Sequence, residues 1–406
     1  MTGGQIGNVD LVKQLNSAAV YRLIDQQGPI SRIQIAELSH LAPASVTKIT
    51  RQLLEFGYIQ EVAQQASTGG RRAISLKTQV TQFHTIAVRI GRDYLQLSLH
   101  DLSGAVLAQD ESSIQYRDQG ELVGQLFDKI ALFKASNEAR IQQLIAIGVI
   151  LPGLVNPVQG EVEYMPNTKI DDLPLAKMLK EEFKVESFVG NDIRAMALAE
   201  HYFGATRDCN DSVMISVHRG TGSGIISGGQ VFLGSNRNVG EIGHIQVDPL
   251  GEQCQCGNFG CLETIAANPA IVKGVKARLA QGYSSSLADE ANIDIDTICE
   301  HALNGDALAT QSIVRVGDQL GKAVAIVINL FNPEKIVIAG HITKAKEILF
   351  PAIQRNVVSQ SLTAFHKDLP IVSSDLELQP TMGAFAIVKR AMLNGILLQK
   401  LMDSAQ

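Results

Sequence analysis

One stretch of the chain concentrates residue types that bind metals. Three of the five cysteines, Cys254, Cys256 and Cys261, fall within eight residues, and His244 stands ten residues before the first of them. One imidazole and three thiolates complete a closed tetrahedral zinc site and leave no position for a catalytic water. Three reduced cysteines in a core are the alternative. The spacing favours one structural zinc ion per chain, whose binding stabilises the 244–264 loop.

A different chemistry is indicated near the N-terminus, where two short helices flank a tight turn. We expect Ser31 to cap the first helix and Pro43 to begin the second, where its missing N–H costs little. This arrangement is typical of a helix-turn-helix, whose second helix enters the major groove of DNA. The predicted packing positions are Val12, Leu15, Ala19 and Leu23 on one face of a preceding helix, Ile35 and Leu38 in the first helix of the motif, and Val46, Ile49 and Leu53 in the second.

Residues 58–77 alternate like a hairpin with a Gly-Gly tip, which predicts a wing. Residues 1–75 carry a net charge of +2 and the remainder −8, so an anionic partner suits the N-terminal segment alone. A three-helix bundle with a solvated polar face is the alternative. The candidate DNA-contacting residues are Ser31, Arg32, Ser45, Thr47, Lys48, Arg51, Arg71 and Arg72.

From residue 83 the pattern changes to that of an α/β protein. Three strands with turns at 91–93 and 102–104 precede a helix over 119–137, a buried strand that ends at Pro152-Gly153, and a strand that enters a helix at 190–192. A similar succession begins again at 211. The repetition predicts two α/β halves facing a cleft. We expect domains at 1–82, 83–195 and 196–384, with an apolar C-terminal helix over 385–406 that packs back onto the first half near the DNA-binding segment.

The body resembles the ROK family of sugar kinases and transcriptional repressors over residues 83–406. The matching motifs are LPG at 151–153, ND at 191–192, GTGSG at 220–224, GEIGH at 240–244, CQCGNFGC at 254–261 and LET at 262–264. The resemblance implies an actin-like, hexokinase-type two-lobed body after the winged helix-turn-helix. It also implies a sugar site, whose residues would be Gly153, Asn191, Asp192, Glu241, His244 and Glu263.

The sequence departs from the kinases of this family at one motif. Their acceptor-deprotonating carboxylate corresponds to Asp192, but their Asp-x-Gly-Gly-Thr turn is altered here. Arg89 stands in place of the aspartate, and Arg92-Asp93 replaces Gly-Thr. Phosphoryl transfer needs backbone contacts to the nucleotide phosphates and a bound Mg²⁺. We therefore expect a protein that is not an enzyme, with an active sugar kinase as the alternative.

As a ROK repressor, the chain is expected to control amino-sugar uptake and catabolism genes. The expected inducer is a sugar phosphate, N-acetylglucosamine 6-phosphate, which would release the protein from its operator. Control by a phosphotransferase-system protein is the alternative. The phosphate is expected at an anion-binding nest made of His218, Arg219, Gly220, Thr221 and Gly222, with Arg89 and Arg92 as second candidates or as partners of nearby carboxylates.

Partners and location follow from the same features. Winged helix-turn-helix proteins read pseudo-palindromes as dimers, so a homodimer, or a tetramer formed by two dimers, is expected. The N-terminal residues lack the pattern of a secretory signal, and no apolar run approaches the ~20 residues that span a bilayer. A cytoplasmic protein without membrane contact is therefore expected.

Overall fold

The computed structural model describes residues 9–63, 74–166, 168–235 and 238–404. The chain divides into two compact units: the first joins residues 1–190 to 384–406, and the second spans 191–383. It therefore passes between them twice, at Gly190–Asn191 and at Gly383–Ala384. Among the described residues, no helix combines the length and hydropathy needed to cross a membrane.

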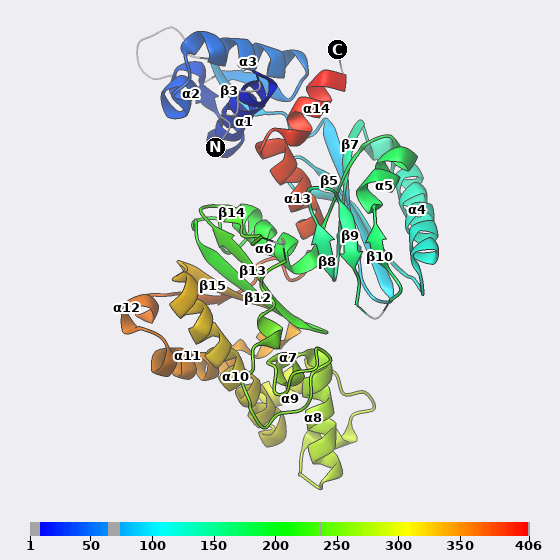
Figure 1. Cartoon of the computed structure of the whole chain (residues 1–406), viewed down its shortest axis with the longest axis vertical. Coiled ribbons are helices and arrows are strands. Elements are labelled where there is room, and N and C mark those ends of the chain that lie inside the picture. The colour runs from blue at the N-terminus through cyan, green and yellow to red at the C-terminus, as the bar shows by residue number, and fades with distance from the viewer. Residues whose placement is uncertain (1–8, 64–73, 167, 236–237, 405–406) are drawn as a thin grey trace, which may run out of the picture. The chain divides into compact units, whose positions relative to one another are not determined.

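The first unit begins with a winged helix-turn-helix, called the head below (Figure 1). The Ser31 side chain accepts a hydrogen bond from the Gln34 N–H, and the Gln34 side chain accepts one from the Ser31 N–H. Pro43 occupies the first turn of the next helix, and His40 takes the left-handed conformation between the two. These caps and the turn confirm the predicted motif. The head consists of α1 (Val9–Gln27), β1 (Ile30–Ser31), α2 (Arg32–Ser39), α3 (Pro43–Glu55), β2 (Ile59–Ala63) and β3 (Ile74–Thr78), with sheet order β1-β3-β2.

Some of the predicted packing positions in the head are wrong. Val12 and Leu15 are 51% and 55% exposed, and Leu38 is 51% exposed. The α1 helix presents two apolar stripes. It packs against α2, α3, β3 and the C-terminal helix α14 (Ile396–Ser404), and the other stripe is the buried one. The buried positions of α1 are Ser17, Ala18, Val20, Tyr21 and Ile24. In α3 the predicted stripe is buried as expected: Val46, Ile49 and Leu53.

The first unit continues with a five-stranded sheet of order β11-β7-β4-β5-β6. Strands β4, β5 and β6 form an antiparallel meander, and β7 runs parallel to β4. A small antiparallel sheet of order β10-β9-β8, which the sequence pattern does not predict, follows β7. The elements are β4 (Phe83–Ile90), β5 (Tyr94–Asp101), β6 (Val106–Ser113), α4 (Gln119–Ser136), β7 (Gln143–Leu151), β8 (Leu154–Asn156), β9 (Glu161–Tyr164), β10 (Asp171–Leu173), α5 (Leu175–Phe183) and β11 (Glu186–Asn191).

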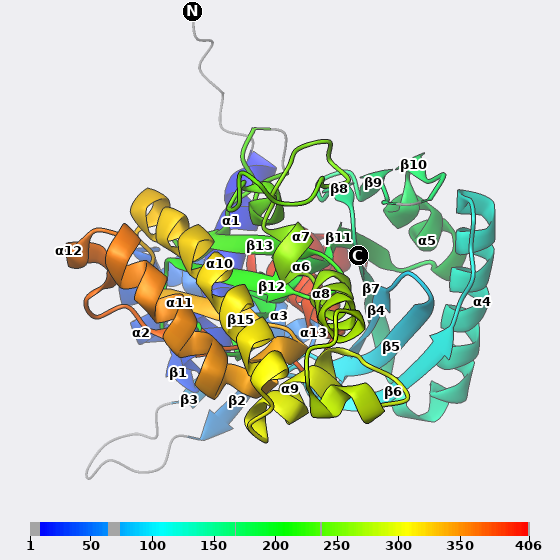
Figure 2. The ribbon, with the colours of Figure 1, turned by 90° about the horizontal axis from the view of Figure 1, so that it is seen from below.

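The second unit repeats this topology. Its sheet has the order β14-β13-β12-β15-β16, again an antiparallel meander followed by two parallel strands. Figure 2 shows α10 and α11 side by side across this sheet. The elements are α6 (Asp192–Phe203), β12 (Ser212–Val217), β13 (Thr221–Ser227), β14 (Gln230–Val231), α7 (Glu263–Ala266), α8 (Asn268–Ala280), α9 (Ile295–Leu303), α10 (Ala307–Phe331), β15 (Lys335–Ala339), α11 (Lys346–Gln360), α12 (Thr363–His366) and β16 (Ile371–Ser373).

The C-terminal segment forms two helices where one was expected. Helix α13 (Met382–Leu393) ends at Leu393, and α14 (Ile396–Ser404) begins after Gly395. Gly395 has φ 82°, a left-handed conformation that ends helices readily only when no Cβ is present. The expected apolar positions Phe385, Val388, Met392, Leu393 and Leu397 are buried, whereas Ile396 is 43% exposed.

Candidate functional site

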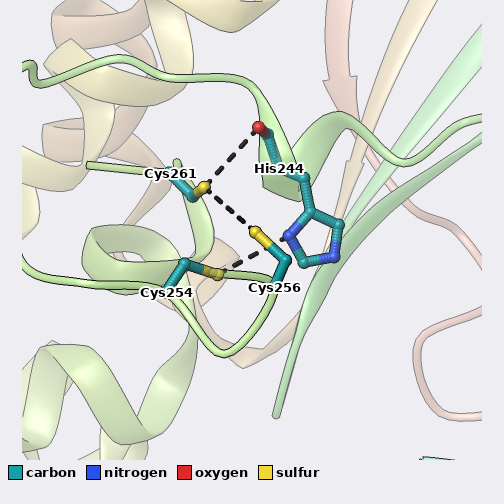
Figure 3. Close-up of side chains that lie close together, drawn as sticks. All are labelled: His244, Cys254, Cys256 and Cys261. Atoms are coloured by element: carbon teal, nitrogen blue, oxygen red, sulfur yellow. Dashed lines mark hydrogen bonds between the residues drawn. The ribbon is translucent and has the colours of Figure 1, made fainter. Parts of the chain in front are cut away.

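The metal-binding residue types come together in the second unit (Figure 3). His244 ends a 3₁₀ turn over Ile242–His244, and Cys261 immediately precedes the Leu262–Glu263 start of α7. Two bridges, Gln246 to Cys261 and Gln253 to Phe259, close the intervening loop. The side-chain ligand atoms of the metal cluster, defined as His244, Cys254, Cys256 and Cys261, all lie within 4.8 Å of one another.

The distances in the metal cluster fit a zinc tetrahedron. With Zn–S of about 2.3 Å and Zn–N of about 2.0 Å, the edges of a regular tetrahedron are about 3.8 Å between sulfurs and about 3.5 Å between sulfur and nitrogen. The Cys256 and Cys261 sulfurs are 3.7 Å apart, and the Cys254 sulfur lies 3.6 Å from His244 Nδ1. The four side chains therefore suit zinc, with Nδ1 as the imidazole ligand.

The thiols of the metal cluster need a cation between them in order to ionise together. Burial raises the pKa of the Cys261 thiol to about 12, whereas the Asn258 backbone N–H lowers the pKa of Cys256 to about 7. Thiolates this close repel one another unless a cation lies between them. Gly260 makes the tight loop possible, because a Cβ there would lie 1.5 Å from the Asp248 carbonyl oxygen.

Most of the predicted sugar-site residues converge within the second unit. A Cβ on Gly240 would lie 2.1 Å from the Ser223 carbonyl oxygen, and one on Gly243 2.1 Å from that of Thr221. The segment that carries Glu241 and His244 therefore lies directly against β13.

Three further predicted residues lie around the same strand. Glu263 Oε2 accepts a hydrogen bond of 3.0 Å from the Thr221 N–H. Asn191 caps α6 by accepting a bond from the Arg194 N–H, and Asp192 is the first residue of that helix. Helix α6 packs on β13. Gly153 follows β7 in the first unit and has φ 128°.

Two residues of the expected anion-binding nest, Thr221 and Gly222, belong to a strand. Residues 221–227 are strand β13, and Gly222 and Gly224 pair with β12. The Thr221 N–H donates to the Glu263 carboxylate, which repels a second anion. Gly224 serves helix packing, because a Cβ there would lie 2.4 Å from the Ala197 Cβ of α6. The sequence pattern cannot distinguish these two uses of glycine, since both need close backbone approach.

A carboxylate that the sequence analysis missed lies beside His218. Glu377 Oε1 is 3.7 Å from His218 Nε2, and Glu377 Oε2 accepts a bond of 2.9 Å from the Gly340 N–H. Glu377 follows β16, 159 positions after His218 in the sequence, so no local pattern joins them. Because Glu263 of α7 also bonds the β12–β13 hairpin at Thr221, the region around His218 and Arg219 carries two carboxylates.

The head presents a polar helix surface on α3. Thr47, Lys48 and Arg51 are exposed and Ser45 is half-buried. Thr47 Oγ1 donates to the Pro43 carbonyl, so Lys48 and Arg51 supply the charge of this surface.

Two other predicted DNA-contacting residues take part in the fold of the motif. Ser31 caps α2, and Arg32 bonds Thr50 at 3.0 Å and Glu61 at 2.9 Å. Arg71 and Arg72 lie outside the described residues.

Known proteins share this combination of a head and a duplicated body. A model of the ROK family matches residues 85–391, and a model of the MarR family matches residues 15–65. The chain belongs to the ROK family. It is 60% identical over 400 residues, 98% of each chain, to the DNA-binding transcriptional dual regulator NagC of Escherichia coli. These matches confirm the resemblance found in the sequence.

Two solved structures, one of a transcriptional regulator and one of a kinase, superpose on this ROK-family chain. A ROK family transcriptional regulator, a homologue of the E. coli MLC protein, superposes with a TM-score of 0.92 at 44% identity and covers 97% of this chain and 100% of its own. A ROK family glucokinase from Streptomyces griseus, in complex with glucose and AMPPNP, superposes with a TM-score of 0.65 at 24% identity over 76% of this chain and 99% of its own. The second similarity shows the fold alone.

The altered kinase turn of this ROK-family chain is covered by two tyrosines. A Cβ on Gly91 would lie 2.3 Å from the Tyr94 ring. The Tyr116 hydroxyl donates to the Gly91 carbonyl at 2.9 Å, and burial raises the pKa of Tyr116 to about 12. Arg92 is exposed. The two tyrosines fill the space beside the turn. This turn therefore differs from an open phosphate-binding loop in its covered backbone as well as in its arginines.

Proposed function

We propose that this protein is a DNA-binding transcriptional repressor released from its operator by an amino-sugar phosphate, N-acetylglucosamine 6-phosphate. The observation that carries the proposal is the 60% identity to NagC across head and body together. The polar surface of α3 supports DNA binding. The convergence of Glu241, His244 and Glu263 beside β13 supports the recognition of sugar hydroxyls, which need paired donors and acceptors at fixed spacing.

We also propose zinc as a structural ion held by the metal cluster. When bound, it would cross-link the loop between His244 and Cys261 and fix the segment that carries Glu241. The protein would carry out no phosphoryl transfer, because the turn at Arg89–Asp93 offers neither the kinase carboxylate at its first position nor an uncovered backbone. A cytoplasmic location follows from the proposed partners, which are operator DNA and a metabolite.

A homodimer, or a tetramer formed by two dimers, fits an apolar surface on the second unit. Leu330, Val358 and Leu362 are 71%, 55% and 59% exposed. The Asn329 side chain donates to the Gln360 carbonyl and accepts from the Leu362 N–H, which holds the ends of α10 and α11 together. Residues 323–333 and 356–366 contain no Asp, Glu, Lys or Arg. Depletion of charge at an apolar core is typical of protein interfaces.

The decisive test is operator binding with and without the sugar. Promoter fragments of amino-sugar genes would be titrated by fluorescence anisotropy, alone and with N-acetylglucosamine 6-phosphate, free N-acetylglucosamine or glucose 6-phosphate. We expect specific binding that only the first compound reverses. Release by a phosphotransferase-system protein instead would favour control by a protein partner. ADP formation from ATP and free N-acetylglucosamine would contradict the non-enzymatic assignment.

Two classes of arginine in the head are expected to behave differently. Arg51→Ala should weaken operator binding by roughly 1–3 kcal/mol through loss of a base contact, with little effect on random DNA. Arg71→Ala and Arg72→Ala should weaken both DNAs and flatten the dependence on salt, because phosphate contacts release counterions. Anisotropy titrations at several salt concentrations check this, with the exposed Lys177→Ala in α5 as control. Equal losses on operator and random DNA for all three variants would contradict the division.

Binding of the inducer's phosphate is expected to depend on Arg219. Two carboxylates lie near the β12–β13 hairpin, so a cation is needed for a phosphate to bind there. Arg219→Ala should remove most of the preference for phosphorylated over free N-acetylglucosamine, about tenfold or more for a lost charge-assisted hydrogen bond. Calorimetric titration with both sugars measures the preference. If Arg92→Ala removes it and Arg219→Ala does not, the phosphate binds at the altered kinase turn.

A further inference from the structure

Helix α13 fastens the DNA-binding head through an almost buried ion pair. Lys389 Nζ of α13 lies 2.6 Å from Asp25 Oδ1 of α1, and the two side chains are 8% and 13% exposed. The same ammonium donates to the Leu102 carbonyl, 3.0 Å away, in the turn after β5. Lys389 therefore joins three segments: the head, the first sheet and the C-terminal helices.

Neighbouring contacts reinforce this junction. Arg22 of α1 donates from Nε and Nη2 to the Leu393 carbonyl at the end of α13, at 3.3 and 3.1 Å. A Cβ on Gly395 would lie 2.9 Å from the Gln14 carbonyl oxygen and 3.0 Å from the Ala18 Cβ. The chain between α13 and α14 is thus in direct contact with the α1 backbone, and the Gln14 side chain also donates to the Asn394 carbonyl.

The opposite end of α13 lies against strands that lead to candidate effector residues. A Cβ on Gly148 of β7 would lie 2.1 Å from the Ala384 carbonyl oxygen, and one on Gly190 of β11 would lie 3.6 Å from an Ile387 methyl. Strand β7 leads to Gly153, and β11 ends at Asn191. The Gly148 contact joins backbone to backbone, so displacement of β7 there passes directly to α13, and displacement of β11 reaches α13 through the Ile387 side chain.

We propose that α13 transmits the effector state to the head and that Lys389 is the positioning residue that makes the connection. The proposal rests on the proposed function for the identity of the effector. A desolvated ion pair suits this role, because separating its two charges leaves each of them buried without a partner, which is energetically costly. The pair therefore holds the two helices in one arrangement. In this scheme effector binding shifts α13, and the Lys389–Asp25 pair carries that shift into α1.

The test compares full-length variants in which the pair is broken or replaced. Lys389→Met removes the ammonium, and Lys389→Met with Asp25→Leu removes both charges, which avoids an unpaired buried carboxylate. The control is Lys400→Met: Lys400 of α14 bonds Glu186 of β11 at 2.7 Å and does not join the head by that bond. Each protein is titrated with N-acetylglucosamine 6-phosphate by calorimetry and with operator DNA in the absence and presence of that sugar.

We expect both Lys389 variants to bind the sugar phosphate within about threefold of the wild type, while the effect of the sugar on DNA affinity shrinks by about tenfold or more. Lys400→Met should respond as the wild type does. A residue with only a structural role would lower stability or overall DNA affinity without changing this ratio. An unchanged ratio in the doubly substituted variant would overturn the proposal.

A second measurement needs no effector. Hydrogen exchange across α1 should be about tenfold faster or more in Lys389→Met, because loss of the pair lets the helix open locally, and unchanged in Lys400→Met. Unaltered exchange in Lys389→Met would also overturn the proposal. If the wild type fails to respond to the sugar phosphate, the proposed function fails, and the exchange of α1 still decides whether Lys389 holds the head.

Discussion

Replacement of Cys261 by serine is expected to abolish zinc binding and the response to the sugar. The thiol is fully buried, and its sulfur is 3.7 Å from that of Cys256. Loss of one of four ligands opens the tetrahedron, and in zinc-finger peptides structural zinc contributes about 10–16 kcal/mol of folding free energy at neutral pH. The loop between His244 and Cys261 would then lose its cross-link, and the adjacent segment that carries Glu241 would no longer be fixed. We expect the zinc content to fall from about one ion per chain to near zero.

Elemental analysis and the sugar-dependent release of operator DNA measure this outcome. Cys299→Ser is the matched control, because Cys299 is also buried but lies in α9, where its sulfur bonds the His341 and Ile342 carbonyls. It should keep its zinc. Cys256→Ser should resemble Cys261→Ser in metal content, since each supplies one ligand. A wild-type protein that contains no metal and responds fully to the sugar would contradict the zinc assignment.

Deletion of residues 390–406 is expected to abolish repression while sugar affinity is partly kept. The deletion removes Arg22's acceptor at Leu393 and the buried side chains Met392, Leu393, Leu397, Leu398 and Met402. Each such side chain contributes roughly 1.5–3 kcal/mol when buried, so the loss approaches the total stability of a small domain. The head would lose its support although Lys389 remains in the shortened chain.

Single substitutions in α14 distinguish the effect of lost side-chain packing from the effect of removing the whole helix. Leu397 is fully buried, so Leu397→Ala should cost about 2–5 kcal/mol of stability. The adjacent Ile396 is 43% exposed, and Ile396→Ala should cost much less. Thermal unfolding and operator titration of both variants and of the deletion check the order of effects. Repression at the wild-type level in the deletion would contradict the role of the C-terminal helices.

Local interactions explain what could be predicted from the sequence. The helix-turn-helix is encoded by the Ser31 and Gln34 capping box and by Pro43, all within one short segment. The metal cluster spans 18 residues from His244 to Cys261, so the loop itself limits how far apart its ligands can lie. The duplicated order of strands and helices follows from hydrophobic periodicity and glycine-bearing turns, which are also local. These features determined the fold class and the candidate metal ligands.

The tertiary structure alone decided which surfaces and partners these elements meet. The α1 helix has two apolar stripes, and packing against α2, α3, β3 and α14 buries the one that contains Tyr21. The Thr221 N–H could have faced an anion, but Glu263, 42 positions away, accepts its hydrogen bond. Asp25 and Lys389 are 364 positions apart. No periodicity or motif relates such distant residues, because their pairing depends on how separately formed elements pack.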